Sequence, residues 1–246
     1  MRQATLVAAY GKKPGPLSKL ISDCQARIAK YPGISFKPYR DYQVHGTVIG
    51  LECVEPSHLH NRNLAEYRVE WKTMDLLGYF DFLENTKLLP ITVQIGGFAN
   101  RKYPFTSRNE RPYKRSFSIQ GDKAVLMGWP VDHDPAPYPE TLEALRKEAV
   151  NFNILHSWHR NSGDKDNDFY MRIGLFDPVP TDARAVRSLE TEMREMLADL
   201  EPTLVEIDLD SLSIVSYNDE TLPLASSVPW PLKQARLPKI LNTLYK

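Results

Sequence analysis

The chain has 246 residues, of which 42% are hydrophobic and 25% charged, and its 31 basic side chains are balanced by 31 acidic ones. A composition of this kind is typical of a globular protein that buries a core. Because the net charge is zero, no overall positive field draws the chain to duplex DNA or to an anionic membrane surface. Any anion is therefore expected to bind in a local pocket.

The cysteines and the apolar segments indicate the compartment. Cys24 and Cys53 are too few for a disulfide framework, so we expect free thiols in a reducing environment and a cytoplasmic protein. The apolar run at residues 4–10 is too short for a secretory signal and is followed by two lysines and a proline. No segment approaches the roughly 18 uninterrupted apolar residues of a membrane span, so no membrane partner is expected.

The hydrophobic pattern of the first half predicts strands alternating with helices. Apolar side chains at helical spacing mark the helices, and alternating or β-branched runs mark the strands. The expected elements are a strand at 4–10, a helix at 17–31, a strand at 44–51, a helix at 73–84 and a strand at 89–95.

The second half repeats this order after a basic, aromatic loop at 101–115. The predicted elements are a hairpin of 116–119 and 124–129, a helix from Pro139 to about Trp158, a strand at 169–176, a helix at 181–199, and one long strand or a pair over 203–215. The tail has four prolines from Pro223 to Pro238, and we expect it to wrap the surface before a short last helix.

The two halves predict a duplicated architecture. Each reads strand, helix, strand, helix, strand, and the middle strands both carry Ile-Gly-Leu, at 49–51 and 173–175. We therefore expect an α+β fold of mainly antiparallel sheets around a central cleft. It would form a single bilobal domain, with lobe one at about 1–100, lobe two at about 116–216, and a Pro-rich tail at 217–246.

The strand at 44–51 carries the first candidate for chemistry. His45 and Thr47 stand two residues apart, so their side chains share one face of the strand. The imidazole can accept or carry a proton near neutral pH, and the hydroxyl can donate to a phosphate oxygen. The pattern His-x-Thr is short, and a strand histidine satisfied by local hydrogen bonds is the simpler interpretation when the pattern stands alone.

With these elements in order, the chain resembles the 2H phosphoesterase superfamily, which contains RNA 2′,5′-ligase-like proteins and 2′,3′-cyclic phosphodiesterases. The resemblance lies in His45-Gly46-Thr47-Val48, in Ile95-Gly96-Gly97-Phe98 and in the order of elements over most of residues 4–216. It implies two lobes, each presenting a His-x-Thr/Ser strand to a shared groove. One imidazole would deprotonate the attacking oxygen while the other protonates the leaving group.

The chain departs from this family at the second motif, where Tyr170-Met171-Arg172 stands in place of His-x-Thr/Ser. An alignment on Ile-Gly-Leu would instead set Phe169 and Met171 opposite the first motif. We prefer the former register, because strand parity puts Tyr170 and Arg172 on one polar face and leaves an apolar face to pack on a helix. In either register the second histidine is missing, and loss of one proton-transfer group typically costs about 10²–10⁴ in rate.

Three explanations for the missing histidine remain open. In the first, Tyr170 serves as the acid while Arg172 binds the phosphate. In the second, a histidine from the preceding segment, His156 or His159, replaces the missing one. In the third, the lobe has kept anion binding and lost catalysis. His156 and His159 also suit the end of a helix, where cations meet the C-terminal dipole.

Aromatic and basic stretches supply further candidates for substrate binding. Tyr42 ends the segment before the motif strand, and Arg115 ends the loop at 101–115, where rings would stack bases and cations would meet phosphates. A solvated loop explains that segment equally well. No metal or cofactor is expected, because no His, Cys or acidic cluster has a familiar ligand spacing.

The sequence thus predicts a 2H-like phosphodiesterase that acts on a cyclic nucleotide, a 2′,3′-cyclic phosphate or an RNA end by metal-independent acid–base chemistry. His45, Thr47, Tyr170 and Arg172 are the predicted catalytic residues. The alternative is a degenerate module that binds a nucleotide or RNA end without turnover, and a third is that the His-x-Thr match is accidental. We expect a monomer whose partner is a small phosphodiester.

Overall fold

The computed structural model describes residues 1–132 and 137–246, and their strands form one ten-stranded sheet in which the strand pairs are antiparallel. The strands are β1 (Gln3–Ala8), β2 (Phe36–Pro38), β3 (Gly46–Gly50), β4 (Ile91–Ile95), β5 (Phe117–Gln120), β6 (Lys123–Pro130), β7 (Phe169–Phe176), β8 (Thr203–Ile207), β9 (Leu212–Tyr217) and β10 (Val228–Pro231). The main path runs β10-β9-β1-β3-β7-β6-β4-β8, while β2 pairs with β7 and β5 with β6.

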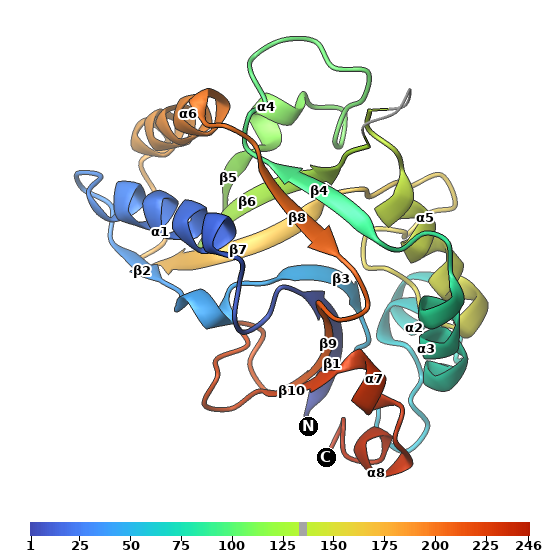
Figure 1. Cartoon of the computed structure of the whole chain (residues 1–246). Coiled ribbons are helices and arrows are strands. Elements are labelled where there is room, and N and C mark those ends of the chain that lie inside the picture. The colour runs from blue at the N-terminus through green and yellow to red at the C-terminus, as the bar shows by residue number, and fades with distance from the viewer. Residues whose placement is uncertain (133–136) are drawn as a thin grey trace.

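The helices gather in separate groups (Figure 1). They are α1 (Gly15–Ala29), α2 (Arg62–Arg68), α3 (Leu76–Asn85), α4 (Pro112–Arg115), α5 (Thr141–Glu148), α6 (Ala183–Asp199), α7 (Leu232–Ala235) and α8 (Pro238–Leu241), with short 3₁₀ turns η1 (Asp41–Gln43) and η2 (Ala149–Phe152). Helix α1 lies next to α6, and Arg27 of α1 forms an ion pair with Glu192 of α6. Helices α2, α3 and α5 stand together at the other side of the molecule, and both chain ends lie near α8 (Figure 1).

The α+β class with mainly antiparallel strands is confirmed, and most predicted elements are present. The predicted helix from Pro139 to about Trp158 is wrong in length, because η2 ends at Phe152 and Asn153 adopts a left-handed conformation with φ 60°. The segment 203–215 forms the pair β8 and β9 rather than one strand. The prolines of the tail do not keep it out of the sheet, since β10 occupies an edge.

The strands of the two halves of the chain alternate in the sheet. From the first half, β1 lies between β9 and β3, and β3 lies between β1 and β7. Strand β4, also from the first half, lies between β6 and β8 from the second. The predicted duplication of units is not confirmed, because each half completes its sheet with strands from the other. The cysteines expected to be free, Cys24 and Cys53, are both buried thiols.

One face of the sheet is covered by the main hydrophobic core, and the other is covered in parts. The core packs α1, α3, α5 and α6 against residues such as Leu6, Ile49 and Met171. On the opposite face a second cluster, which includes Met127 and Trp129, covers β6, and a third, which includes Val215, covers β1 and β9. The stretch of β3 and β7 between these two clusters is left open and forms a pocket.

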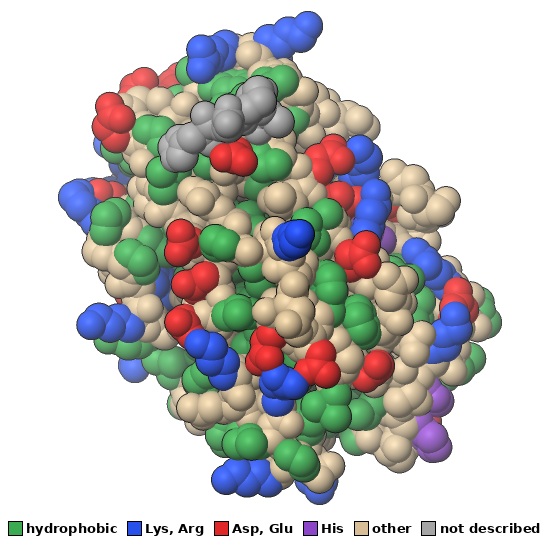
Figure 2. Space-filling view, turned by 45° about the vertical axis from the view of Figure 1, so that its right-hand side comes forward, with side chains coloured by type: hydrophobic (Ala, Val, Ile, Leu, Met, Phe, Trp, Pro, Cys, Tyr) green, Lys and Arg blue, Asp and Glu red, His purple; other side chains and the backbone are tan. Residues whose placement is uncertain are grey.

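The surface carries mixed charge. Figure 2 shows Lys and Arg side chains interspersed with Asp and Glu over the face it presents, without a large patch of one sign. This agrees with the balance of 31 basic and 31 acidic residues in the sequence. Within the described part of the chain, no helix combines the length and the apolar character that crossing a membrane requires.

Candidate functional site

The two predicted motifs lie side by side at the centre of the sheet, where Gly46 of β3 pairs with Met171 of β7. Continued from this pair, the antiparallel register brings His45 toward Arg172 and Thr47 toward Tyr170, although the two strands separate on the Thr47 side. All four side chains are turned to the same side of the sheet, where they line one pocket. Met171 is buried in the core beneath, while Tyr170 and Arg172 are partly exposed. The structure therefore brings together all the residues predicted to be catalytic.

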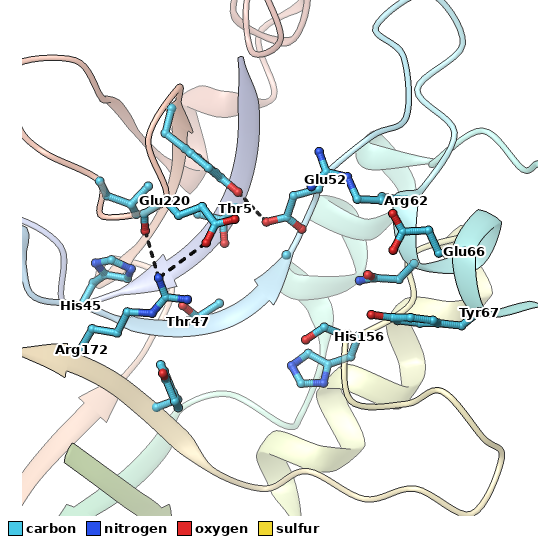
Figure 3. A pocket seen from close by; sticks show the side chains of 16 residues that line it. Thr5, His45, Thr47, Glu52, Arg62, Glu66, Tyr67, His156, Arg172 and Glu220 are labelled. Atoms are coloured by element: carbon cyan, nitrogen blue, oxygen red, sulfur yellow. Dashed lines mark hydrogen bonds and ion pairs between the residues drawn. The ribbon is translucent and has the colours of Figure 1, made fainter. Parts of the chain in front are cut away.

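A pocket of about 370 Å³ opens over this group. His45, Thr47, Tyr170 and Arg172 line it. Figure 3 shows His45, Arg172 and Thr47 toward one end of the pocket, and further polar side chains from α2 at the other end.

The imidazole of His45 is held in one tautomer. Its Nδ1 lies 2.8 Å from the carbonyl oxygen of Gln43, and a carbonyl can only accept, so Nδ1 carries the hydrogen and Nε2 is left as an acceptor. The ring of Tyr10 packs edge-on against it, with 5.8 Å between centroids. Burial lowers the pKa of His45 to about 4, and the nearby charges of Arg172 and Lys13 lower it further against the opposing effect of the Gln43 hydrogen bond. His45 is thus neutral at pH 7, with a free lone pair.

Arg172 is engaged weakly by the loop that follows β9. Its Nη1 donates to the carbonyl oxygen of Glu220 at 3.5 Å and lies 3.8 Å from the Glu220 carboxylate. The Glu220 side chain is 74% exposed, so this ion pair is screened by water. The guanidinium also lies 5.8 Å from the ring centroid of Tyr170. An anion that enters the pocket therefore meets a cation whose present partner is easily displaced.

A β-bulge in β3 extends the pocket along the strand. Leu6 of β1 pairs with Ile49 and the next residue, Val7, pairs with Thr47, which leaves Val48 as the extra residue. The bulge shifts the parity of the strand, so Gly50 and Glu52 face the same side as His45 and Thr47. This explains why Gly50 and Glu52 also line the pocket.

The far end of the pocket is built around Glu52. Tyr217 donates its hydroxyl hydrogen to Glu52 Oε1 at 2.7 Å, and a β-carbon placed on Gly50 would lie 2.1 Å from Glu52 Oε2, so the carboxyl group rests directly over the glycine. Burial raises the pKa of Glu52, although the hydrogen bond from Tyr217 opposes that shift. Arg62, the first residue of α2, donates its backbone N–H to the Glu52 carbonyl oxygen at 2.9 Å and lines the pocket beside it.

Arg146 of α5 holds the two motif strands where their ladder ends. Its guanidinium donates to the carbonyl oxygens of Val48 at 2.8 Å and Thr47 at 3.0 Å on β3. The same group donates to the carbonyl oxygens of Asp166 at 2.7 Å and Asp168 at 3.1 Å, which precede β7. Arg146 is 1% exposed, and it takes the place of ladder hydrogen bonds between two diverging strands.

His156 lines the pocket, but its ring is committed elsewhere. The backbone N–H of Trp158 donates to Nδ1 at 3.4 Å, so Nε2 carries the hydrogen and faces the Asp166 carboxylate at 3.7 Å. Burial lowers the pKa of His156 well below its usual range, and the charge of Arg146 adds to the effect. A neutral imidazole with both nitrogens turned to the protein does not replace the missing histidine.

The other predicted substrate-binding residues lie outside this pocket. His159 is buried and its Nε2 contacts Glu143 at 2.8 Å. Arg115 is paired with Asp168 at 2.9 Å, so its charge is used within the fold. Tyr42 is 51% exposed and does not line the pocket. Glu143 and Asp168 thus hold His159 and Arg115 away from this pocket, whereas Tyr42 points to the surface.

The loop at 101–115 is a packed segment rather than a free substrate loop. Tyr103 and Phe105 join the second cluster over β6. Arg108 stacks on the ring of Trp158 at 3.5 Å and lies 3.7 Å from Asp168. Over residues 1–132 and 137–246, no group of three or more His, Cys, Asp or Glu side chains is arranged to hold a metal ion.

The residues at the far end of the pocket were missed from the sequence. Glu52 lies an odd number of residues beyond His45, so simple alternation placed it on the opposite face. Arg62 and Tyr217 come from segments with no recognisable motif. A signal was present in Gly50, since an isolated glycine within a strand suggests a bulge or a close approach.

Comparison with known proteins gives a structural likeness. No family model matches the chain, and no curated protein does. Among solved structures, the chain is similar to a conserved protein of unknown function from Agrobacterium tumefaciens, with a TM-score of 0.46 and 14% identity over 89% of this chain and 81% of that chain.

Proposed function

We propose that this protein binds a small phosphodiester, such as a 2′,3′-cyclic nucleotide or an RNA end, in the pocket over β3 and β7 and hydrolyses it by acid–base chemistry. The observation that carries the proposal is the cross-strand group around Gly46 and Met171. It sets an acceptor nitrogen, two hydroxyls and a guanidinium on one face of a rigid sheet. These are the groups needed to hold a phosphate and to move protons around it.

His45 supplies the base in this proposal. Its Nε2 takes a proton from water as the water oxygen bonds to phosphorus, while the Gln43 carbonyl keeps the ring oriented. A pKa of about 4 makes the imidazole a weak base in the empty pocket. A phosphodiester anion beside the ring favours the charged imidazolium and so raises this pKa when it binds.

Tyr170 supplies the acid. It belongs to the neighbouring strand and lines the same pocket as His45, so a phosphate in the pocket lies between the two side chains. The phenol gives its proton to the leaving oxygen as the bond from phosphorus to that oxygen breaks, which yields a phosphomonoester and an alcohol. Proton exchange through solvent then returns imidazolium and phenolate to their starting forms. Arg172 and Thr47 hold the non-bridging oxygens.

A second candidate function is nucleotide or RNA-end binding without turnover. The low pKa of His45 favours it, because a weakly basic imidazole deprotonates water poorly. The cation and hydroxyls beside it would still bind a phosphate. The place of the second imidazole is taken by Tyr170, which fits a pocket that has kept its anion contacts.

Hydrolysis of a phosphodiester panel tests the proposal. Wild-type protein is incubated with the four 2′,3′-cyclic nucleotides, a short RNA that ends in a cyclic phosphate, and linear dinucleotides. We expect turnover that falls about 10²–10⁴-fold in His45→Gln and about 10²-fold in Tyr170→Phe. Tyr42→Phe is the matched control, because Tyr42 lies outside the pocket.

The two candidate functions give different results. If wild-type protein hydrolyses no member of the panel, the hydrolase proposal fails. Calorimetry that then shows nucleotide binding, weakened in Arg172→Ala, would support the binding module. Turnover that persists unchanged in His45→Gln would place the chemistry elsewhere and remove this pocket from the mechanism.

A further inference from the structure

The pocket has a second polar end that phosphodiester chemistry does not require. Figure 3 shows Glu52, Arg62 and Glu66 gathered at the opposite end of the pocket from His45. A carboxylate is an unfavourable neighbour for a phosphate, so its presence in a phosphate pocket needs another explanation.

Strand geometry places Glu52 too far from His45 to act on the same phosphate. The β1 partners of Thr47 and Gly50 are Val7 and Thr5, two residues apart. At about 3.3 Å per residue, Gly50 lies roughly 7 Å along the sheet from Thr47 and roughly 13 Å from the level of His45. Because the Glu52 carboxyl rests over Gly50, a ligand that reaches both ends must be about as long as a nucleoside monophosphate.

The atoms at this end present a specific pattern. Glu52 Oε1 accepts from Tyr217, and Oε2 lies over Gly50, where no Cβ stands in its way. An ionised carboxylate only accepts hydrogen bonds, and it has lone pairs to spare for two further N–H groups. Arg62 stands beside it and offers N–H donors to an acceptor atom of the ligand.

We propose that Glu52 and Arg62 select a guanine base, so that the substrate is a guanosine phosphodiester. The edge of guanine carries one acceptor, O6, next to two donors, N1–H and the N2 amino group. Arg62 meets the acceptor and the Glu52 carboxylate meets the two donors, while the phosphate lies over Thr47, His45 and Arg172. This inference rests on the proposed function for the position of the phosphate.

The other bases fit this end less well. The pairing edges of adenine and cytosine each place an acceptor nitrogen beside the amino group, and that nitrogen would face the lone pairs of a carboxylate. Uracil places its single N–H between two carbonyl oxygens. A site built to hydrogen-bond one pattern rejects the others strongly, because its buried polar groups are then left unpaired. Glu52 is a half-buried carboxyl at the pocket wall, and Tyr217 occupies only one of its oxygens.

Binding of the four nucleoside 3′-monophosphates, measured by calorimetry, tests the inference without any turnover. With wild-type protein we expect guanosine 3′-monophosphate to bind at least about 10-fold more tightly than the adenosine, cytidine and uridine compounds. In Glu52→Gln the guanosine compound should lose about 10-fold or more in affinity, while the other three change less than about threefold.

Two further variants separate base recognition from folding and from net charge. Gly50→Ala keeps every charge but pushes the carboxyl aside, because the new Cβ would lie 2.1 Å from Oε2 at the flexible end of Glu52. The guanine preference should fall in this variant with little change in melting temperature. Glu66→Gln removes a negative charge from the same pocket and should leave the order of the four bases unchanged.

The results distinguish this inference from the proposed function. Equal binding of all four nucleotides, or a guanine preference that survives both Glu52→Gln and Gly50→Ala, would overturn the inference even if the protein is a hydrolase. A guanine preference lost in both variants would support it even if no phosphodiester is hydrolysed. Failure of all four nucleotides to bind would overturn it.

Discussion

The guanidinium of Arg146 donates a hydrogen bond to the carbonyl oxygen of Thr47 at 3.0 Å, so a helix residue 99 positions away holds the backbone of the first motif. The same side chain reaches the carbonyl oxygen of Asp168 just before β7. Arg146 therefore spans the gap that opens between β3 and β7 beyond Gly46. It sets the angle at which the two motif strands present their side chains to the pocket.

Replacing Arg146 by Met is expected to destabilise the protein by about 3–5 kcal/mol. The variant leaves the carbonyl oxygens of both strands without donors and removes the cation that lies 3.4 Å from the Asp166 carboxylate. Denaturant unfolding monitored by circular dichroism measures the change. Arg187→Met, on the exposed side of α6, is the control and should stay within about 0.5 kcal/mol of wild type. A loss below about 1 kcal/mol in Arg146→Met would show that Arg146 does not hold the strands.

The glycine of the His-Gly-Thr motif is expected to be required by packing. A Cβ at Gly46 would lie 2.0 Å from the Cζ atom of the Phe169 ring, which is fully buried and has no space to move into. Gly46→Ala should therefore cost about 1–3 kcal/mol of folding free energy. Adding Phe169→Leu should recover part of this loss. Gly15→Ala, where nothing lies within 4 Å, should be neutral; equal stability of the two single variants would contradict the argument.

Local pattern was sufficient to predict the elements with a strong hydrophobic period. The strand predicted at 169–176 is β7, Phe169–Phe176, because its alternating apolar residues have a core face to fill. The helix predicted at 181–199 is α6, whose N-cap Asp182 accepts from the backbone N–H of Arg184 and Ala185. The same alternation correctly placed Tyr170 and Arg172 on the open face.

What could not be predicted depends on contacts between distant segments. The bulge at Val48 is defined by pairing with β1 and by hydrogen bonds from Arg146, and Gly50 is its one trace in the local sequence. Without the bulge, Glu52 is assigned to the wrong face. His159 was a candidate for the missing histidine because it precedes the second motif, but Glu143 of α5 holds it away from the pocket.

The stability of the protein is expected to depend on pH through His45. Its pKa is about 4 in the folded state, whereas an unfolded histidine has a pKa near 6.5. Between these values the unfolded chain binds the proton and the folded chain does not, so folding stability falls as the pH drops from about 6.5 to 4. The His45 contribution to this loss is on the order of 3 kcal/mol. His156, whose pKa is also lowered, adds a loss of the same sign.

Urea unfolding at a series of pH values measures this dependence. In His45→Gln the free energy of unfolding should vary less between pH 4 and 6.5 than it does in wild type. His58→Gln is the matched control, because that side chain is 61% exposed and its replacement should leave the curve unchanged. An identical slope in wild type and His45→Gln would show that His45 titrates normally in the folded protein.

Arg172 is expected to act on ligand binding far more than on folding. Its side chain is 26% exposed and its ion-pair partner Glu220 lies on an exposed loop, so Arg172→Ala should shift the melting temperature little. A charge-assisted hydrogen bond to phosphate contributes about 1.5–3 kcal/mol, which corresponds to a loss of roughly 10- to 150-fold in affinity for guanosine 3′-monophosphate. Arg40→Ala removes the same charge outside the pocket and serves as the control.

Glu220 provides the opposite test of the same contact. Its carboxylate lies 3.8 Å from Arg172 and competes with an incoming phosphate for that cation. Glu220→Gln removes the competitor, so the affinity for guanosine 3′-monophosphate should rise about two- to fivefold at low salt, and the gain should shrink as salt screens the pair. The double variant Arg172→Ala/Glu220→Gln should show no such gain over Arg172→Ala. A gain that persists in the double variant would mean that Glu220 acts on the ligand by some route other than Arg172.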